Sequence, residues 1–130
     1  MSKYAVEDFL KKENIFAVVG ATDNKDKYGY KVFKKLIDLG YESYPVNPNK
    51  ENILGRKVYP KLKDVPENPD VVSIITPPKV TTEIVKECKE LKIDKVWMQP
   101  GAESKEAVEF CNQNEINLLH NRCIMIETYQ

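Results

Sequence analysis

Short segments rich in apolar and aromatic residues alternate with longer amphipathic segments along the chain. Five of the short segments have the length of a strand, and each ends at a glycine, a proline or a polar residue. The first is apolar at every position, so both of its faces are expected to be covered, as in a parallel sheet. The predicted strands are residues 15–19, 41–46, 71–75, 95–98 and 116–119.

The longer segments place apolar residues at helical spacing, so they predict helices between the strands. Ser104 stands at the start of one of these segments, and its hydroxyl can cap the first turn. The predicted helices are residues 30–39, ended by Gly40, residues 80–91 and those after Ser104, with a short N-terminal helix around residues 5–10. We expect residues 53–59 to be extended, residues 62–65 to form a short turn, and the C-terminal residues to cover a sheet edge.

This alternation predicts an α/β fold. The expected architecture is a Rossmann-like three-layer α/β/α domain, formed by residues 1–130, with a five-stranded, mostly parallel sheet. Right-handed crossovers between successive strands give an expected order of 3-2-1-4-5, with the first strand central. The turns after the first four strands should then meet at one rim, where open α/β sheets bind ligands.

Composition excludes several classes of function. Twenty basic and twenty acidic residues cancel, which is not the basic balance expected of a nucleic-acid-binding domain. No apolar run approaches the roughly 18 residues of a membrane span, and no signal peptide is apparent. The three cysteines are widely separated, so we expect reduced thiols in a cytoplasmic protein, with neither a disulfide framework nor a metal site.

The turn after the first strand has the features of a phosphate site. Gly20 would let a ligand approach the backbone, and a helix starting near Tyr28-Gly29 would direct its amide groups to the same place. Lysines surround this turn, including Lys27. The alternative is an ordinary strand-to-helix turn with solvated lysines.

The motifs of the common nucleotide sites are absent. After Gly20 the next glycine is Gly29, so there is no G-x-G-x-x-G fingerprint, and no Gly-Lys-Ser/Thr of a P-loop follows. An NAD site also favours an acidic residue at the tip of the second strand, where this chain has Val46-Asn47-Pro48. The residues therefore favour a phosphate-bearing ligand other than ordinary NAD.

Several stretches together resemble the stand-alone coenzyme A-binding domains, which are similar to the N-terminal domain of the succinyl-CoA synthetase α-subunit. The resemblance runs from about Ile15 to Glu127 and combines Gly-Ala-Thr, Pro-Val-Asn-Pro and Trp-Met-Gln-Pro-Gly. Its matching stretches are residues 17–22, 40–41, 45–48, 53–55, 58–59, 70–72, 96–99, 101 and 121–123. The chain departs from the family at Asn121, where Asp is common.

The resemblance implies that coenzyme A, or a short acyl-CoA, lies across the strand rim. Gly20, Ala21 and Thr22 would meet the phosphates, and the helix start at Tyr28-Gly29 would close the site. The residues implied as ligand contacts are Gly20, Ala21, Thr22, Lys27, Tyr28, Gly29, Val46, Asn47, Pro48, Thr76, Pro77, Pro78 and Gln99. Within this set Val46 to Pro48 would flank the adenosine, Thr76 to Pro78 the pantetheine or adenine, and Gln99 the far side. Lys50 and Arg56 are further candidates for the ribose 3′-phosphate.

We expect a binding, carrier or sensor module with no catalytic residues of its own. Arg122 could activate Cys123, and His120 lies three positions away, so a small Cys123-dependent thiol or acyl-transfer enzyme is one alternative. An NAD(P)- or nucleotide-binding regulator is another, and a domain that serves only as an interaction surface is a third. Cys88, Cys111 and Trp97 are expected to be core residues. A homodimer or an unknown protein partner is possible on this reading.

Overall fold

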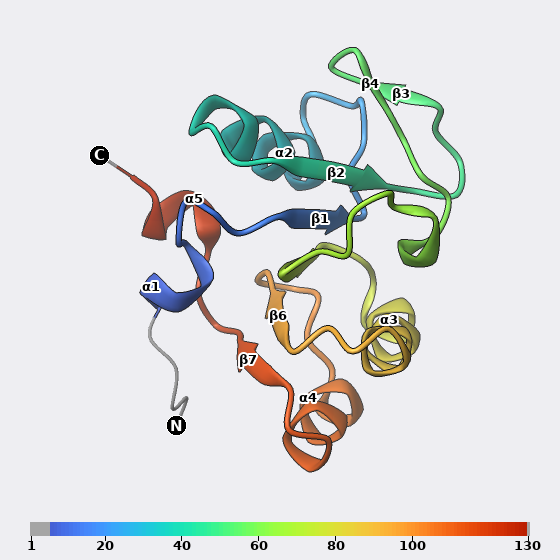
Figure 1. The fold of residues 1–130 in the computed structure, drawn as a ribbon, viewed down its shortest axis with the longest axis vertical. Helices are drawn as coiled ribbons and strands as arrows, with labels where there is room; N and C mark the ends of the chain where they lie inside the picture. The colour runs from blue at the N-terminus through green and yellow to red at the C-terminus, as the bar shows by residue number, and fades with distance from the viewer. Residues whose placement is uncertain (1–5, 130) are drawn as a thin grey trace.

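The computed structural model describes residues 6–129, which form a parallel sheet between two layers of helices (Figure 1). The sheet has five strands in the spatial order β2-β1-β5-β6-β7, and every pairing is parallel. The strands are β1 (Phe16–Val19), β2 (Ser43–Val46), β5 (Val71–Ile74), β6 (Lys95–Met98) and β7 (Asn117–Leu119). The predicted Rossmann-like α/β/α fold and its five strands are confirmed.

The predicted strand order, 3-2-1-4-5, differs from the observed order in the place of the third strand. The two agree only if Tyr59, which pairs beside β2, is counted as the third strand. Tyr59 bridges Val46 in parallel beyond β2, with hydrogen bonds from its N–H to Pro45 O and from Asn47 N–H to its own carbonyl, both 3.0 Å. The segment expected in third place, β5, instead pairs with β1 on its other side, Phe16 opposite Val71. That assignment was wrong because the residues after β2 turn back along its free edge and occupy the third position themselves.

The segment that reaches this edge is short and irregular. It forms a two-stranded antiparallel hairpin of β3 (Asn52–Ile53) and β4 (Arg56–Lys57), followed by the 3₁₀ turn η1 (Leu62–Asp64). The short turn predicted at residues 62–65 is present. Residues 53–59, expected to be extended, instead turn back at Leu54-Gly55 to form the hairpin. The chain then crosses back to β5.

Each face of the sheet is covered by its own helices. One core lies beneath α3 (Pro78–Glu90) and α4 (Lys105–Gln113), and the other beneath α1 (Val6–Phe9), α2 (Tyr28–Asp38) and α5 (Ile124–Glu127). Strand β1 serves both, because Ala17 and Val19 point into the first core and Phe16 and Val18 into the second. Burying each large apolar side chain stabilises the fold by about 1.5–3 kcal/mol.

The predicted helices are present with shifted boundaries. Helix α3 begins earlier than expected, at Pro78, because proline needs no hydrogen bond for its nitrogen in the first turn. Helix α4 starts as predicted, with Ser104 Oγ accepting the Ala107 N–H at 3.0 Å. Ala5, in the predicted N-terminal helix, lies outside the described residues. The C-terminal helix α5 does not cover a sheet edge but packs beside α2, with Ile124 buried in the same core.

The core positions expected for Cys88, Cys111 and Trp97 are confirmed, since all three side chains are fully buried. Trp97 Nε1 donates to Arg122 O at 3.0 Å, which anchors the segment leading into α5. Burial raises the pKa of Cys88, and it raises the pKa of Cys111 to about 12. All three cysteines are free thiols.

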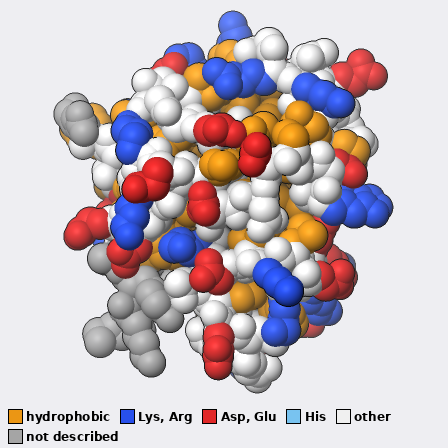
Figure 2. All heavy atoms as spheres, in the orientation of Figure 1, with side chains coloured by type: hydrophobic (Ala, Val, Ile, Leu, Met, Phe, Trp, Pro, Cys, Tyr) orange, Lys and Arg blue, Asp and Glu red, His pale blue; other side chains and the backbone are white. Residues whose placement is uncertain are grey.

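The surface carries both signs of charge. Figure 2 shows Lys and Arg interspersed with Asp and Glu over the face in view, with hydrophobic atoms between them. Over residues 6–129, no helix combines the length and the apolar character that crossing a bilayer requires. Over the same residues, no group of three or more His, Cys, Asp or Glu side chains is placed to hold a metal ion.

Candidate functional site

A pocket of about 800 Å³ opens at the carboxyl ends of β1, β2 and β5. Its other wall is α3, and residues 60–63 close one end. A pocket of this volume is within the usual range for small-molecule sites, and the carboxyl ends of parallel strands are where such folds bind ligands. The convergence of turns expected from the sequence is therefore present for three of the four strands.

Six of the residues implied by the resemblance line this pocket. They come from the ends of three strands that are far apart in the sequence. They are Gly20, Val46, Asn47, Pro48, Thr76 and Pro77. The structure thus brings together the turn after β1, the tip of β2 and the turn after β5.

Four other implied residues lie beside the pocket rather than in its lining. Ala21 is buried, and its carbonyl accepts a hydrogen bond from Asn47 Nδ2 at 2.8 Å. Thr22 Oγ1 accepts the Asn24 N–H at 3.2 Å, which shapes the loop. Lys27 is exposed at the N-cap of α2, where its side chain makes no capping bond, and Pro78 is exposed at the first position of α3.

Gly20 is required by the fold as well as by any ligand. Its φ is +97°, and a Cβ there would lie 2.3 Å from the carbonyl oxygen of Ile75. Gly29 packs against the same turn, because a Cβ on Gly29 would lie 2.2 Å from Gly20 O. Substituting Gly20 would therefore disturb the fold, so that change is no clean test of ligand binding.

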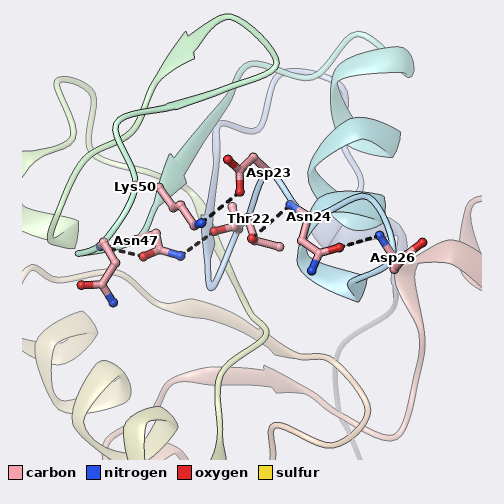
Figure 3. Close-up of polar contacts among 8 residues, drawn as sticks. Thr22, Asp23, Asn24, Asp26, Asn47 and Lys50 are labelled. Atoms are coloured by element: carbon pink, nitrogen blue, oxygen red, sulfur yellow. Dashed lines mark hydrogen bonds and ion pairs between the residues drawn. The ribbon is translucent and has the colours of Figure 1, made fainter.

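The loops after β1 and β2 are linked by two side-chain contacts (Figure 3). Asn47 donates to Ala21 O, and its Oδ1 also accepts the Asn49 N–H at 2.8 Å. Lys50 Nζ lies 3.1 Å from Asp23 Oδ1, and this partner lowers the pKa of Asp23. Sequence reasoning found Asn47 and Lys50 but not Asp23, because its pairing depends on the approach of two loops.

Gln99 and Tyr28 lie on the α2 side of the sheet, away from the pocket lining. Gln99 is fully buried; its Oε1 accepts the Ile124 N–H at 2.9 Å, and its Nε2 donates to Ser73 Oγ at 3.3 Å. The Tyr28 hydroxyl donates to the same Oε1 at 3.4 Å and contacts Cys123 Sγ. Burial raises the pKa of Tyr28. These contacts give both residues a structural role, and their contact with a ligand stays a prediction.

The reactive-looking residues do not meet at the pocket. Cys123 is half-buried beside Tyr28, where α5 packs on α2. Among residues 6–129, His120 Nδ1 is buried without a hydrogen-bond partner, so this nitrogen does not contact the thiol. Neither Cys123 nor His120 is among the residues that line the pocket.

Sequence reasoning missed the wall of the pocket that α3 provides. Val80, Glu83, Ile84 and Glu87 recur at the spacing of one helical face and line it. Glu87 is half-buried, and burial raises the pKa of its carboxyl while the backbone amide of Lys63 lowers it. The helical spacing of these residues is visible in the sequence, but spacing alone does not show which side of the helix faces the pocket at the strand ends.

A family model described as a CoA binding domain matches residues 14–129 of the chain. The chain belongs to this CoA-binding domain family. The match covers all strands and places the pocket at the carboxyl rim of a CoA-binding domain. The resemblance drawn from the sequence is thereby confirmed.

Curated relatives include both short and long proteins. The uncharacterized protein YneT of Bacillus subtilis is 28% identical over 96% of this chain and 93% of its own length. The α-subunit of acetate–CoA ligase (ADP-forming) II of Pyrococcus furiosus is 29% identical over 92% of this chain. The chain spans only 28% of that ligase subunit. The CoA-binding domain therefore resembles one part of the ligase.

Solved structures share the whole architecture. A hypothetical protein from Pyrococcus horikoshii matches with a TM-score of 0.89 and 34% identity, over 94% of this chain and 86% of that chain. A conserved hypothetical protein from Pyrococcus furiosus matches with a TM-score of 0.84 and 41% identity, over 88% and 99% of the two chains. Chains of similar length with the same fold thus occur in Pyrococcus horikoshii and Pyrococcus furiosus.

Proposed function

We propose that this CoA-binding domain binds coenzyme A or a short acyl-CoA in the pocket at the carboxyl rim, and that it catalyses no reaction by itself. The observation that carries this proposal is the pocket lining. Gly20, Asn47 and Thr76, from three separate strand ends, meet around one volume of about 800 Å³ in a domain of this family.

The residues around the pocket fit the chemistry of a phosphate-bearing ligand. The uncapped start of α2 packs against Gly20, so the positive end of the helix lies next to the turn that lines the pocket. Lys50 follows the pocket-lining tip of β2 directly, whereas Arg56 lies on the exposed β4 of the hairpin. Lys50 is therefore the better candidate for a phosphate contact.

The opposite wall suits the less charged part of such a ligand. Val80 and Ile84 give it an apolar surface, while Glu83 and Glu87 repel phosphate. We infer that the phosphates lie near the loops after β1 and β2. The nucleoside or the pantetheine arm then lies along α3.

Two observations weigh against the alternative functions. The residue at the tip of β2 is Asn47, whose amide donates to Ala21 O, so the carboxylate that NAD sites use for the ribose is replaced there. Cys123 lies on the other face of the sheet beside Tyr28, which weighs against a Cys123-dependent enzyme acting in this pocket. The names of the ligase relatives fit a shared ligand, coenzyme A, rather than a shared reaction of this domain.

A thermal-shift panel of coenzyme A, acetyl-CoA, NAD and ATP tests the ligand class. A ligand at 100 times its dissociation constant stabilises the folded state by about 2.7 kcal/mol. For a chain of this length that corresponds to a rise in melting temperature of about 10 °C. A rise with NAD but none with either CoA species would contradict the proposal.

Val80→Trp tests the location of the site. Val80 lines the pocket and is 43% exposed, so a larger side chain can enter the pocket without disturbing the core. We expect at least a tenfold loss of CoA affinity by calorimetry, because the indole occupies the volume the ligand needs. Lys89→Trp is the matched control, since Lys89 is exposed on the same helix outside the pocket lining. Equal affinities for the two variants would place the site elsewhere.

A further inference from the structure

We propose that Asp23 sets the affinity of the pocket for its ligand by competing with the ligand's phosphate for the Lys50 ammonium group. This inference rests on the proposed function, because it takes the ligand to be a phosphate-bearing one. In this structure the Asp23 carboxylate pairs with the Lys50 ammonium group. The phosphate of the ligand would replace the carboxylate in this contact.

The position of the pair relative to the pocket supports this exchange. Asp23 stands three residues after Gly20, and Lys50 two residues after Pro48, and both Gly20 and Pro48 line the pocket. Lys50 Nζ and Asp23 Oδ1 are 3.1 Å apart and bridge the two loops directly (Figure 3). A phosphate entering between these loops therefore meets the ammonium group and the carboxylate together.

The charges of the pair make the two partners competitors. A carboxylate only accepts hydrogen bonds, so it repels a phosphate, whereas the lysine ammonium carries three donors that suit either anion. An ordinary aspartate is ionised at neutral pH, and the hydrogen bond with Lys50 lowers the pKa of Asp23 further. The competing anion is thus present under the conditions in which the ligand would bind.

The two side chains can exchange partners without opening the loops. The Lys50 side chain is 37% exposed and the Asp23 side chain is 57% exposed, so each can rotate into water. The backbone beneath them is held separately, by Asn47 Nδ2 on Ala21 O and by Asn24 N–H on Thr22 Oγ1. Ligand entry therefore requires a change of ion partner and no refolding of the loop.

Removing the Asp23 charge should tighten binding. Asp23→Asn keeps the shape of the side chain and frees Lys50 to meet the phosphate. We expect CoA to bind about twofold to fivefold tighter, the upper part of the range for an exposed ion pair. The gain should shrink as salt rises from 50 mM to 500 mM, because both interactions are screened.

A double-mutant cycle with Lys50→Met separates competition for Lys50 from a general charge effect. The probe is CoA, measured by calorimetry on the full chain, with circular dichroism to establish folding. In the Lys50→Met background, Asp23→Asn should change affinity by less than twofold. Asp26→Asn is the matched control, since Asp26 is an exposed aspartate of the same loop with no part in the pair. It should also stay within twofold of the unmodified protein.

Three outcomes overturn the inference. Asp23→Asn could leave CoA affinity unchanged, its gain could persist without Lys50, or Asp26→Asn could produce an equal gain. Each of these leaves the proposed function standing, because CoA still binds. A failure of CoA to bind any of the folded proteins would instead overturn the proposed function and this inference with it.

Discussion

Gly29→Ala is a change for which helix propensity predicts a gain in stability and the packing in the structure predicts a loss. Gly29 is the second residue of α2 and is buried, and its backbone is helical. Replacing a helical glycine by alanine ordinarily stabilises a protein by about 1 kcal/mol. Here the added methyl group would lie 2.2 Å from the carbonyl oxygen of Gly20.

The magnitude follows from this contact. A carbon atom rests about 3.3 Å or more from a carbonyl oxygen, so the helix and the turn would have to part by about 1 Å. Overpacking of this kind costs about 1–3 kcal/mol, and the upper end applies because the clashing oxygen is backbone. Subtracting the gain of about 1 kcal/mol in propensity leaves a net loss of about 2 kcal/mol.

Thermal and urea unfolding measure this loss. At about 4 °C per kcal/mol for this length, the melting temperature of Gly29→Ala should fall by about 8 °C. Lys31→Ala, an exposed change in the same helix, should stay within about 0.5 kcal/mol of the unmodified protein. A melting temperature for Gly29→Ala that rises by about 4 °C would refute the close packing of α2 on the Gly20 turn.

Two further predictions concern ionisation. At pH 8 a thiol reagent should modify only Cys123 rapidly in the folded protein and all three cysteines in guanidinium chloride, because Cys88 and Cys111 are fully buried. Fast labelling of all three thiols in the native protein would contradict the burial of Cys88 and Cys111. Burial also raises the pKa of Cys111 to about 12, so the stability that comes from keeping this thiol neutral is complete below its unfolded pKa and declines as pH rises above about 8.5. Hydrogen bonding to Glu42 raises the pKa of Tyr44 to about 12, so its stabilising effect is complete below pH of about 10 and is lost as pH rises toward 12. In an ultraviolet titration, Glu42→Gln should show one fewer tyrosine with a raised pKa than the unmodified protein. An unchanged titration curve would exclude the contact between Tyr44 and Glu42.

Much of the fold could be predicted from the sequence because its elements depend on local patterns. The apolar run at β1 and the capping serine at α4 each fix an element through side chains within a few residues. The Gly-Ala-Thr and Pro-Val-Asn-Pro stretches likewise stand at strand ends whatever the rest of the chain does. This is why the α/β class, the five strands and the family were all predicted correctly.

The sequence could not determine which strands are neighbours. Tyr59 takes the edge position beside β2, and β5 returns to β1, because main-chain hydrogen bonds between distant segments decide the pairing. Main-chain groups are the same at nearly every residue, so they leave no sequence signal. The exchange of positions was therefore visible only in the tertiary structure.

For the site, the sequence determined which residue types stand at the strand ends, and the tertiary structure decided which of them meet. Gly20, Asn47 and Thr76 share one pocket, whereas Gln99, from the next strand, points to the other face and is used in holding Ile124 and Ser73. Asp23 gained its significance only when Lys50 was placed 3.1 Å away. The physical reason is that side-chain direction and loop approach depend on packing across the whole domain, while the chemical character of each turn is already present in its own residues.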